Sequence, residues 1–181
     1  MQTLIKKNFN NQNQTYAFID AANLIYGTKY ENWKIDFAKL IKYLRERYQV
    51  DKAYYYAGIE ISNEQQKKFF EKLRQFGYHL RLKPVKLYTR DDGSVTKKAN
   101  CDVDMTFDMM RFFDQYQKAI ILTGDGDFAP IVEYLVAKKQ LIRVIANGSR
   151  TAKELKQIAG QGFIDLRGLK DILEYTKTGL L

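Results

Sequence analysis

AIILTGDGDFAPIVEYL, residues 119–135, is the stretch of sequence that decides the fold. Its first four residues are apolar and are followed by a glycine-rich turn, which is typical of a short buried strand. Apolar residues then return at helical spacing from residue 128 onward. The stretch therefore predicts a strand, a tight loop and a helix in direct succession.

The same alternation continues outward from this stretch in both directions. Strands are expected at residues 16–20, 52–57, 78–82, 119–122, 141–146 and 163–166. Helices are expected at residues 35–48, 63–76, 102–113, 128–138 and 151–159, with a closing turn or helix at 169–175. Strands that alternate with helices indicate a mainly parallel sheet covered on both faces. The predicted fold class is therefore α/β, as a three-layer α/β/α sandwich.

The length and composition are those of one globular domain. The chain has 181 residues, of which 45% are hydrophobic and 28% charged, enough for one domain with a substantial core and too few for two comfortable ones. We expect a single domain over residues 15–176. Residues 1–14, which contain an asparagine and glutamine run, are expected to be a flexible N-terminal segment, and residues 177–181 a C-terminal tail.

Membrane insertion and export are not indicated by the sequence. No stretch approaches the roughly 20 apolar residues that span a bilayer, and the first residues lack the continuous apolar segment of a secretory signal. The single cysteine, Cys101, cannot form an internal disulfide. We therefore expect a cytoplasmic protein with no membrane partner.

The charge balance favours a polyanionic partner. Thirty lysine and arginine residues against 21 aspartate and glutamate residues give a net charge of +9, which favours nucleic acid, although many basic proteins bind none specifically. The lone histidine, His79, argues against catalysis by a histidine pair. No glycine-rich phosphate-binding motif occurs at a strand-to-helix junction, so no nucleotide cofactor is expected.

Three acidic clusters lie where a strand passes into a helix or where a helix begins. They comprise Asp20 and Asn23 in FIDAAN, Asp102, Asp104 and Asp108 in CDVDMTFD, and Asp125 and Asp127 in TGDGDF. In an open parallel sheet, ligands bind beyond the carboxyl ends of the strands, near the point where the strand order reverses. Carboxylates that converge there repel one another unless a cation offsets their charge, and hard oxygen ligands suit Mg²⁺ or Mn²⁺. The pattern predicts a divalent-metal site that could activate water for phosphodiester hydrolysis.

Each acidic residue also fits a purely structural role. Asp20 and Asn23 are of types favoured in turns and at helix caps, and Asp127 could cap the helix that follows it. The acids in the first turns of the helix at residues 102–113 could complement the helix dipole. Taken singly, each residue fits this structural interpretation at least as well, and the shared location of the three clusters favours the metal site.

The acids of the helix at residues 102–113 are not equivalent. Asp104 and Asp108 lie four residues apart on one helical face, whereas Asp102 points elsewhere. The three side chains therefore cannot all reach one metal ion equally. Asp108 is the weakest candidate, because a single helical acid is more often solvated or ion-paired than a ligand.

Five segments of the chain are distinctive in combination. They are AFIDAANLIYG, KAYYYAGIE, CDVDMTFDMM, AIILTGDGDFAPIVEYL and SRTAKELKQIAGQGFIDL, in order from about residue 16 to residue 173. Together they resemble the NYN domain family, PIN-like nucleases related to the LabA and DUF88 group. The resemblance implies a PIN-like fold with a divalent-metal site at Asp20, Asp102, Asp125 and Asp127, and with Asn23 alongside.

The resemblance further implies Asp104 as an additional metal ligand and Asp108 as a supporting acid. Two positions depart from the family pattern. Family members commonly have Lys-Gly-Val before the acidic pair, whereas this chain has KKANC at residues 97–101, which leaves the role of a lysine there open. Thr123 stands before Gly124 in place of the more usual serine, a change that keeps the hydroxyl.

A basic stretch at residues 83–98 leads directly into the acidic helix, with a hairpin turn expected at Asp92-Gly93. Basic side chains can follow a phosphate backbone while aromatic rings stack on splayed bases, so single-stranded RNA is the favoured partner and this stretch a substrate-gripping flap. A solvated hairpin fits nearly as well, because Asp91 and Asp92 lie at its tip. The expected substrate-binding residues are Arg90, Lys97, Lys98, Thr123 and Arg150, with Arg143 as a further phosphate contact.

The predicted function is a metal-dependent ribonuclease, in which Asn23 orients a carboxylate or a metal-bound water. Two alternatives remain open. One is a nucleic-acid-binding regulatory module that keeps the acidic pocket and cuts nothing, and the other is a Mg²⁺-dependent phosphatase, which would also place aspartates at strand ends. The sequence leaves open the choice of RNA or DNA, the native metal, and whether copies of the chain form a homo-oligomer.

Overall fold

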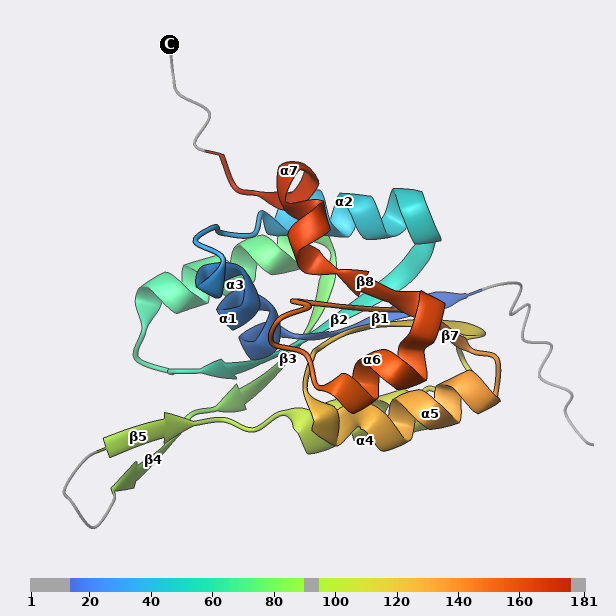
Figure 1. Cartoon of the computed structure of the whole chain (residues 1–181). Helices are drawn as coiled ribbons and strands as arrows, with labels where there is room; N and C mark the ends of the chain where they lie inside the picture. The colour runs from blue at the N-terminus through green and yellow to red at the C-terminus, as the bar shows by residue number, and fades with distance from the viewer. Residues whose placement is uncertain (1–13, 90–94, 177–181) are drawn as a thin grey trace, which may run out of the picture.

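A six-stranded sheet forms the centre of the computed structural model, which describes residues 14–89 and 95–176, and the side chains of residues 14–87 and 99–176. Its strands are β1 (Thr15–Asp20), β2 (Val50–Ile59), β3 (Tyr78–Pro84), β6 (Lys118–Leu122), β7 (Leu141–Ala146) and β8 (Phe163–Asp165). They lie in the order β3-β2-β1-β6-β7-β8, and every neighbouring pair is parallel (Figure 1). The parallel sheet predicted from the sequence is confirmed.

Helices cover both faces of this sheet, which confirms the three-layer α/β/α sandwich (Figure 1). One face carries α1 (Ala21–Tyr30), α2 (Phe37–Tyr48), α3 (Glu64–Phe76) and α7 (Lys170–Leu173). The other face carries α4 (Asp102–Arg111), α5 (Ala129–Ala137) and α6 (Lys153–Ala159). Short 3-10 helices are η1 (Gly126–Phe128), η2 (Gly160–Gly162) and η3 (Leu166–Leu169).

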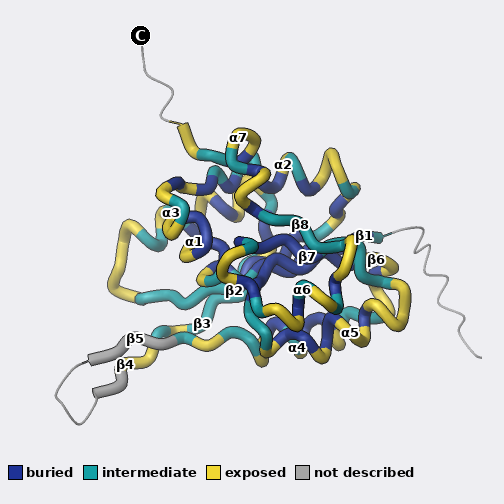
Figure 2. Tube along the Cα trace, in the orientation of Figure 1, coloured by how far each residue is buried: buried dark blue, intermediate teal, exposed yellow. Residues whose placement is uncertain are grey.

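The sheet separates two hydrophobic cores, and successive strand residues alternate between them. Ile19 and Tyr55 point into the core shared with α1, α2 and α3. Phe18, Tyr54 and Tyr56 point into the core shared with α4, α5 and α6. The three consecutive tyrosines are therefore core residues of both layers, and the sheet is the buried centre of the molecule (Figure 2).

Helix α1 was not expected from the sequence, which predicted no element between residues 20 and 35. The side chain of Asp20 caps it by accepting the Asn23 backbone N–H. Its buried face includes small residues, and a Cβ at Gly27 would lie 3.1 Å from the Cβ of Asn147. The apolar pattern of α1 is weak, so the sequence did not indicate this helix. Its close packing against the loop after β7 is seen only in the structure.

The basic stretch forms an antiparallel pair of strands, β4 (Lys86–Thr89) and β5 (Val95–Lys98), beyond the end of β3. In Figure 1 this pair projects from the body of the domain. The expected turn at Asp92-Gly93 lies outside the described residues. The pairing of Lys86 with Lys98 supports the expected hairpin on either side of it.

The two ends of the chain fall largely outside the described residues. The expected flexible segment is described only at Gln14, whose carbonyl accepts backbone hydrogen bonds from Gln117 and Lys118, so Gln14 belongs to the folded part. The expected tail, residues 177–181, lies outside the described part, and the predicted domain bounds stay a prediction. Within residues 14–89 and 95–176, no helix combines the length and the apolar character needed to cross a bilayer.

The strand order reverses between β1 and β6. From β1 the chain builds outward to β2 and β3, and from β6 it builds in the opposite direction to β7 and β8. Ile19 pairs with Leu122 at the ends of the two strands, so the residues that follow them leave the sheet side by side. This switch point is where open parallel sheets bind their ligands.

Candidate metal centre

Three carboxylates meet at this switch point. One oxygen each of Asp102, Asp125 and Asp127 lies within 4.8 Å of the other two. Asp102 is the first residue of α4, whereas the other two belong to the loop that leads from β6 into η1. The structure thus brings together two of the three acidic clusters that the sequence singled out.

Asp20 lies beside these three carboxylates and combines both roles considered for it. It lines the same open pocket, of about 500 Å³, as Asp102 and Asp125. One of its carboxylate oxygens accepts the Asn23 backbone N–H at 3.1 Å, which caps α1, and the other accepts the Thr123 hydroxyl at 3.0 Å. The helix cap therefore holds Asp20 at the edge of the acidic pocket.

The pocket concentrates negative charge in partly desolvated surroundings. Burial, followed by the charges of Asp20, Asp125 and Asp127, raises the pKa of Asp102. Burial also raises the pKa of Asp20, even though its hydrogen bonds act in the opposite direction. Ionised carboxylates are thus disfavoured here unless a cation offsets them, and an all-oxygen donor set suits a hard divalent ion. The residues present fit Mg²⁺ or Mn²⁺.

The loop between β6 and η1 is held by side chains on both sides. The Asn23 side-chain oxygen accepts the Gly124 N–H at 2.8 Å. Asp125 accepts the N–H of Asp127 at 3.0 Å and so caps η1. A Cβ at Gly124 would come within 2.6 Å of the Thr151 hydroxyl oxygen, so only glycine fits at this close approach. The two loop aspartates are therefore placed by a rigid loop.

Thr123 has a different place from the one expected. It is only 1% exposed, so the expectation that it contacts substrate is corrected. Its hydroxyl donates to Asp20 and accepts the Asp125 N–H at 3.2 Å. Thr123 therefore joins the loops after β1 and β6 from beneath the pocket.

Asp104 and Asp108 face away from the acidic pocket, into a separate pocket of about 610 Å³ between α4 and β3. Asp104 pairs with Lys83 at 2.6 Å. Asp108 is 4% exposed and pairs with Arg81 at 2.8 Å and Arg111 at 2.6 Å. These ion pairs account for both carboxylates. The structure brings neither Asp104, expected as a metal ligand, nor Asp108, expected as a supporting acid, into the group of Asp102, Asp125 and Asp127.

Asp108 also accepts a hydrogen bond from the buried Tyr56 hydroxyl at 3.0 Å. Burial, and then the negative charge of Asp108, raises the pKa of Tyr56 well above its usual range, so this hydroxyl stays a donor. Replacing Asp108 by alanine would leave Tyr56 without this acceptor and two arginines without their anion. We expect the free energy of unfolding to fall by about 2–4 kcal/mol.

Urea denaturation of Asp108→Ala measures this effect, with Asp104→Ala as the control. The two residues share one face of α4, but the Asp104–Lys83 pair is exposed and should contribute no more than about 1 kcal/mol. Equal losses of stability in the two variants would contradict this account of the buried network.

The basic residues expected to bind substrate differ in their position relative to the acidic pocket. Arg150 lines the acidic pocket, and Arg143 does not, because it lies in the middle of β7 rather than at its carboxyl end. Lys97 and Lys98 belong to β5, whose side chains are not described, and Arg90 lies outside the described residues. Among the described side chains, Arg150 is thus the expected basic residue that lies beside the carboxylates.

Among the pocket residues that the sequence did not single out as part of the site are Tyr26, Gly58, Asn100 and Cys101. The Asn100 side chain accepts the Asp102 N–H at 2.8 Å and so helps to start α4. Its position two residues before Asp102 was the signal available for it. Burial raises the pKa of Cys101 to about 11, so its thiol is protonated near neutral pH.

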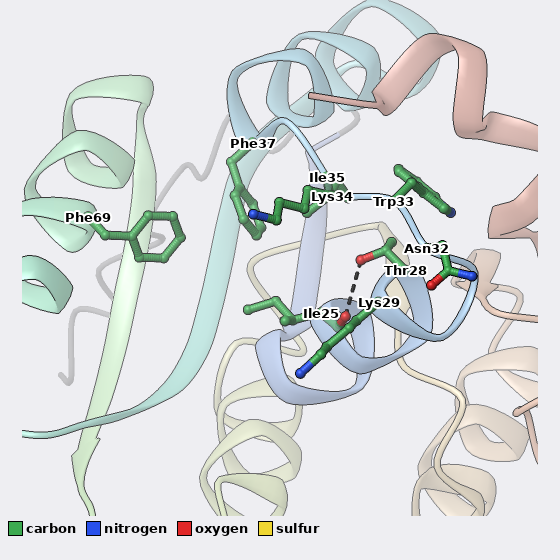
Figure 3. A pocket seen from close by; sticks show the side chains of 9 residues that line it. All are labelled: Ile25, Thr28, Lys29, Asn32, Trp33, Lys34, Ile35, Phe37 and Phe69. Atoms are coloured by element: carbon green, nitrogen blue, oxygen red, sulfur yellow. Dashed lines mark hydrogen bonds between the residues drawn. The ribbon is translucent and has the colours of Figure 1, made fainter. Parts of the chain in front are cut away.

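A further pocket, of about 490 Å³, lies between α1 and α3 and has a different character (Figure 3). It is lined mainly by apolar side chains such as Ile25, Trp33 and Phe69. The Thr28 hydroxyl at its edge donates to the Ile25 carbonyl. No carboxylate lines it, so the chemistry of the acidic clusters lies elsewhere.

This chain is similar in sequence or fold to known proteins. The NYN domain matches residues 14–169. The "Low amplitude and bright protein LabA" of Synechococcus elongatus is 30% identical over an alignment of 164 residues, which covers 88% of this chain and 87% of that protein. A crystal structure of a protein of unknown function from Vibrio parahaemolyticus has a TM-score of 0.74 at 23% identity, covering 96% of this chain and 99% of the other, which shows the fold alone. The match over most of the chain, with the three carboxylates at the switch point of its sheet, shows that the chain belongs to the NYN domain family.

Proposed function

We propose that this protein is a divalent-metal-dependent ribonuclease that hydrolyses phosphodiester bonds of single-stranded RNA. The observation that carries the proposal is the convergence of Asp102, Asp125 and Asp127 within 4.8 Å at the switch point of the sheet. Membership of the NYN domain family, which is PIN-like, supports a nuclease. The net charge of +9 supports a nucleic-acid substrate.

Asp102, Asp125 and Asp127 would hold Mg²⁺ or Mn²⁺, with Asp20 next to them directly or through water. When bound, such an ion lowers the pKa of a coordinated water and offsets the charge of the scissile phosphate. Asp104 and Asp108 are not assigned to the metal here, because each already has a cationic partner.

The other side chains of the pocket would orient the reactants. Asp20 is held by two donors and can accept a proton from the attacking water. The carbonyl oxygen of the Asn23 side chain is taken by Gly124, which leaves its amide nitrogen as a donor to a phosphate oxygen or a water. Arg150, at the rim, would contact a phosphate of the substrate.

The direct test is incubation of the purified protein with end-labelled single-stranded RNA in Mn²⁺, Mg²⁺ or EDTA. We expect cleavage in one or both metals and none in EDTA. Tight binding without cleavage in either metal would favour the regulatory module instead. Release of phosphate from monoesters, with RNA left intact, would favour the phosphatase.

Metal binding itself should stabilise the fold. At a Mn²⁺ concentration roughly 10–100 times the dissociation constant, we expect the Tm of the natural sequence to rise by about 3–10 °C. Asp102→Asn should lose most of this rise, whereas Asp171→Asn, an exposed acid of α7, should keep it. A scan of thermal unfolding against Mn²⁺ concentration measures the difference.

Without metal, the Asp102→Asn variant should be at least as stable as the natural sequence. The pKa of Asp102 is raised in the folded protein, so stability falls as the pH rises through the interval between the ordinary and the raised pKa. Near neutral pH in EDTA, removing this charge should leave the Tm of Asp102→Asn equal to or above that of the natural sequence. A lower Tm in EDTA, together with an unchanged response to Mn²⁺, would contradict the assignment of Asp102.

A further inference from the structure

We propose, on the basis of the ribonuclease function proposed above, that Tyr26 and Tyr30 on α1 form a stacking platform for two bases of a single-stranded nucleic acid beside the acidic pocket. Arg150 would complete this platform by contacting the phosphates. The platform would hold the strand on one side of the carboxylates and favour substrates with unpaired bases.

The first support is the exposure and spacing of the two tyrosines. Tyr26 and Tyr30 are 62% and 60% exposed, although large aromatic side chains usually find cover. They are four residues apart, so they share one face of α1 and their Cα atoms are about 6 Å apart along its axis. Two rings one helical turn apart offer successive faces to successive splayed bases.

The second support is their position relative to the carboxylates. Asp20 caps α1, and Tyr26, less than two turns along the helix, lines the same pocket as Asp20, Asp102 and Asp125. Tyr30 continues the same face away from the pocket. A strand whose scissile phosphate lies at the carboxylates would therefore meet Tyr26 first and Tyr30 next.

The third support is the cation on the platform. The guanidinium carbon of Arg150 lies 5.2 Å from the centre of the Tyr30 ring, and Arg150 also lines the acidic pocket. A guanidinium next to a ring is a common arrangement for binding a nucleotide, because its N–H groups can donate to phosphate while its plane stacks. Arg150 thus links the tyrosines to the pocket.

Buried hydrogen bonds fix the position of Arg150 relative to the two tyrosines. Asn147, at the start of the loop that carries Arg150, is 4% exposed. Its amide nitrogen donates to the Gly27 carbonyl at 3.2 Å and to the Glu31 carboxylate at 2.9 Å, both on the α1 side. Its side-chain oxygen accepts the Arg150 backbone N–H at 3.1 Å. Asn147 therefore fixes Arg150 relative to the helix that carries the tyrosines.

A single strand fits this surface better than a duplex. Bases within a duplex already stack on their neighbours and do not present a free face to a side chain, whereas splayed bases do. Stacking is also tolerant of sequence, because every base has a π face. The platform therefore implies selectivity for unpaired RNA without strong sequence preference.

The test compares two fluorescent probes by anisotropy: a 12-nucleotide oligoadenylate, and an abasic oligomer of the same length and charge. Binding is measured in EDTA, where the proposed nuclease does not cleave, and a gel confirms that each probe stays intact. The variants are Tyr26→Ala, Tyr30→Ala, their double variant and the corresponding phenylalanine variants. Tyr175→Ala is the control, because Tyr175 is also exposed and lies near α7, away from the pocket.

We expect each alanine variant to bind the oligoadenylate about 5- to 100-fold more weakly and the abasic oligomer unchanged. The phenylalanine variants and Tyr175→Ala should bind both probes like the natural sequence. Equal affinity of the double alanine variant and the natural sequence for oligoadenylate would overturn the platform. A change of mass in solution, seen by light scattering in the alanine variants without a change in binding, would overturn it in favour of contact between copies of the chain.

The outcomes separate this inference from the proposed function. Loss of base-dependent binding in the alanine variants, in a protein that never cleaves RNA, would support the platform and reject the nuclease. Metal-dependent cleavage with unchanged binding by the alanine variants would support the nuclease and reject the platform.

Discussion

Asp125→Asn should lower the rate of RNA cleavage by at least about 100- to 1000-fold. Asp125 contributes to the three-carboxylate group and also caps η1, which carries Asp127. Asparagine keeps an oxygen that can accept the Asp127 N–H, so the loop should survive while the charge is lost. Single-turnover cleavage of labelled RNA at saturating Mn²⁺ measures the effect.

The control for this prediction is Asp171→Asn, which removes an exposed carboxylate from α7. It should cleave at the rate of the natural sequence. Asp20→Asn should resemble Asp125→Asn, because Asp20 lines the same pocket and the amide can still cap α1. Full activity in both Asp20→Asn and Asp125→Asn, with the fold intact, would contradict the proposed site.

Thr123→Val should have the second-largest effect on activity, although the Thr123 side chain is buried. Valine has nearly the same shape, but it cannot donate to Asp20 or accept the Asp125 N–H. We expect cleavage to fall about 10- to 100-fold, because the Asp20 carboxylate and the Asp125 backbone each lose a hydrogen bond that places them. The buried N–H left without its acceptor should cost about 1–3 kcal/mol of stability.

Thr123→Ser distinguishes a hydrogen-bonding role from a packing role. Serine keeps the hydroxyl and loses only a methyl group, so its cleavage rate and Mn²⁺ affinity should stay close to those of the natural sequence. A loss of cleavage in Thr123→Ser, together with full activity in Thr123→Val, would show that the methyl group, and not the hydroxyl, matters at this position.

The fold was largely predictable because its signals are local. Each strand of the sheet is a short apolar run followed by a turn, as in AIILTGDGDF, and strands that alternate with helices leave few arrangements other than a parallel sheet. Helix α1 was the exception. Its buried face uses Ala21, Leu24, Gly27 and Thr28, and small residues that pack closely against another loop leave no strong apolar period in the sequence.

Only those features of the acidic site that follow from the geometry of a parallel sheet could be predicted from the sequence. The proximity of Asp20 and Asp125 follows from the shared edge of the parallel strands β1 and β6, and Asp102 joins them from the start of α4. The different place of Asp104 does not, because its partner Lys83 comes from β3, which is distant in sequence. Helical phase separated Asp102 from Asp104 and Asp108 correctly, but the cations that neutralise the latter two could be found only in three dimensions.

The roles of polar residues beneath and beside the site were also hidden from the sequence. Thr123 was expected to bind substrate, whereas its burial depends on the packing of the loops after β1 and β6. Tyr26 carried no signal, because it lies on the helix that was missed. Contacts between residues of separate βα units therefore could not be predicted from the sequence and were seen only in the structure.

The most direct test of the central claim is to measure Mn²⁺ occupancy by electron paramagnetic resonance and the RNA cleavage rate on the same samples across a Mn²⁺ titration. If Asp102, Asp125 and Asp127 hold the catalytic ion, occupancy and cleavage rate should rise together, and both should be lost in Asp125→Asn. Cleavage that persists in EDTA, or that is unchanged in Asp125→Asn while Mn²⁺ binding is lost, would contradict the claim.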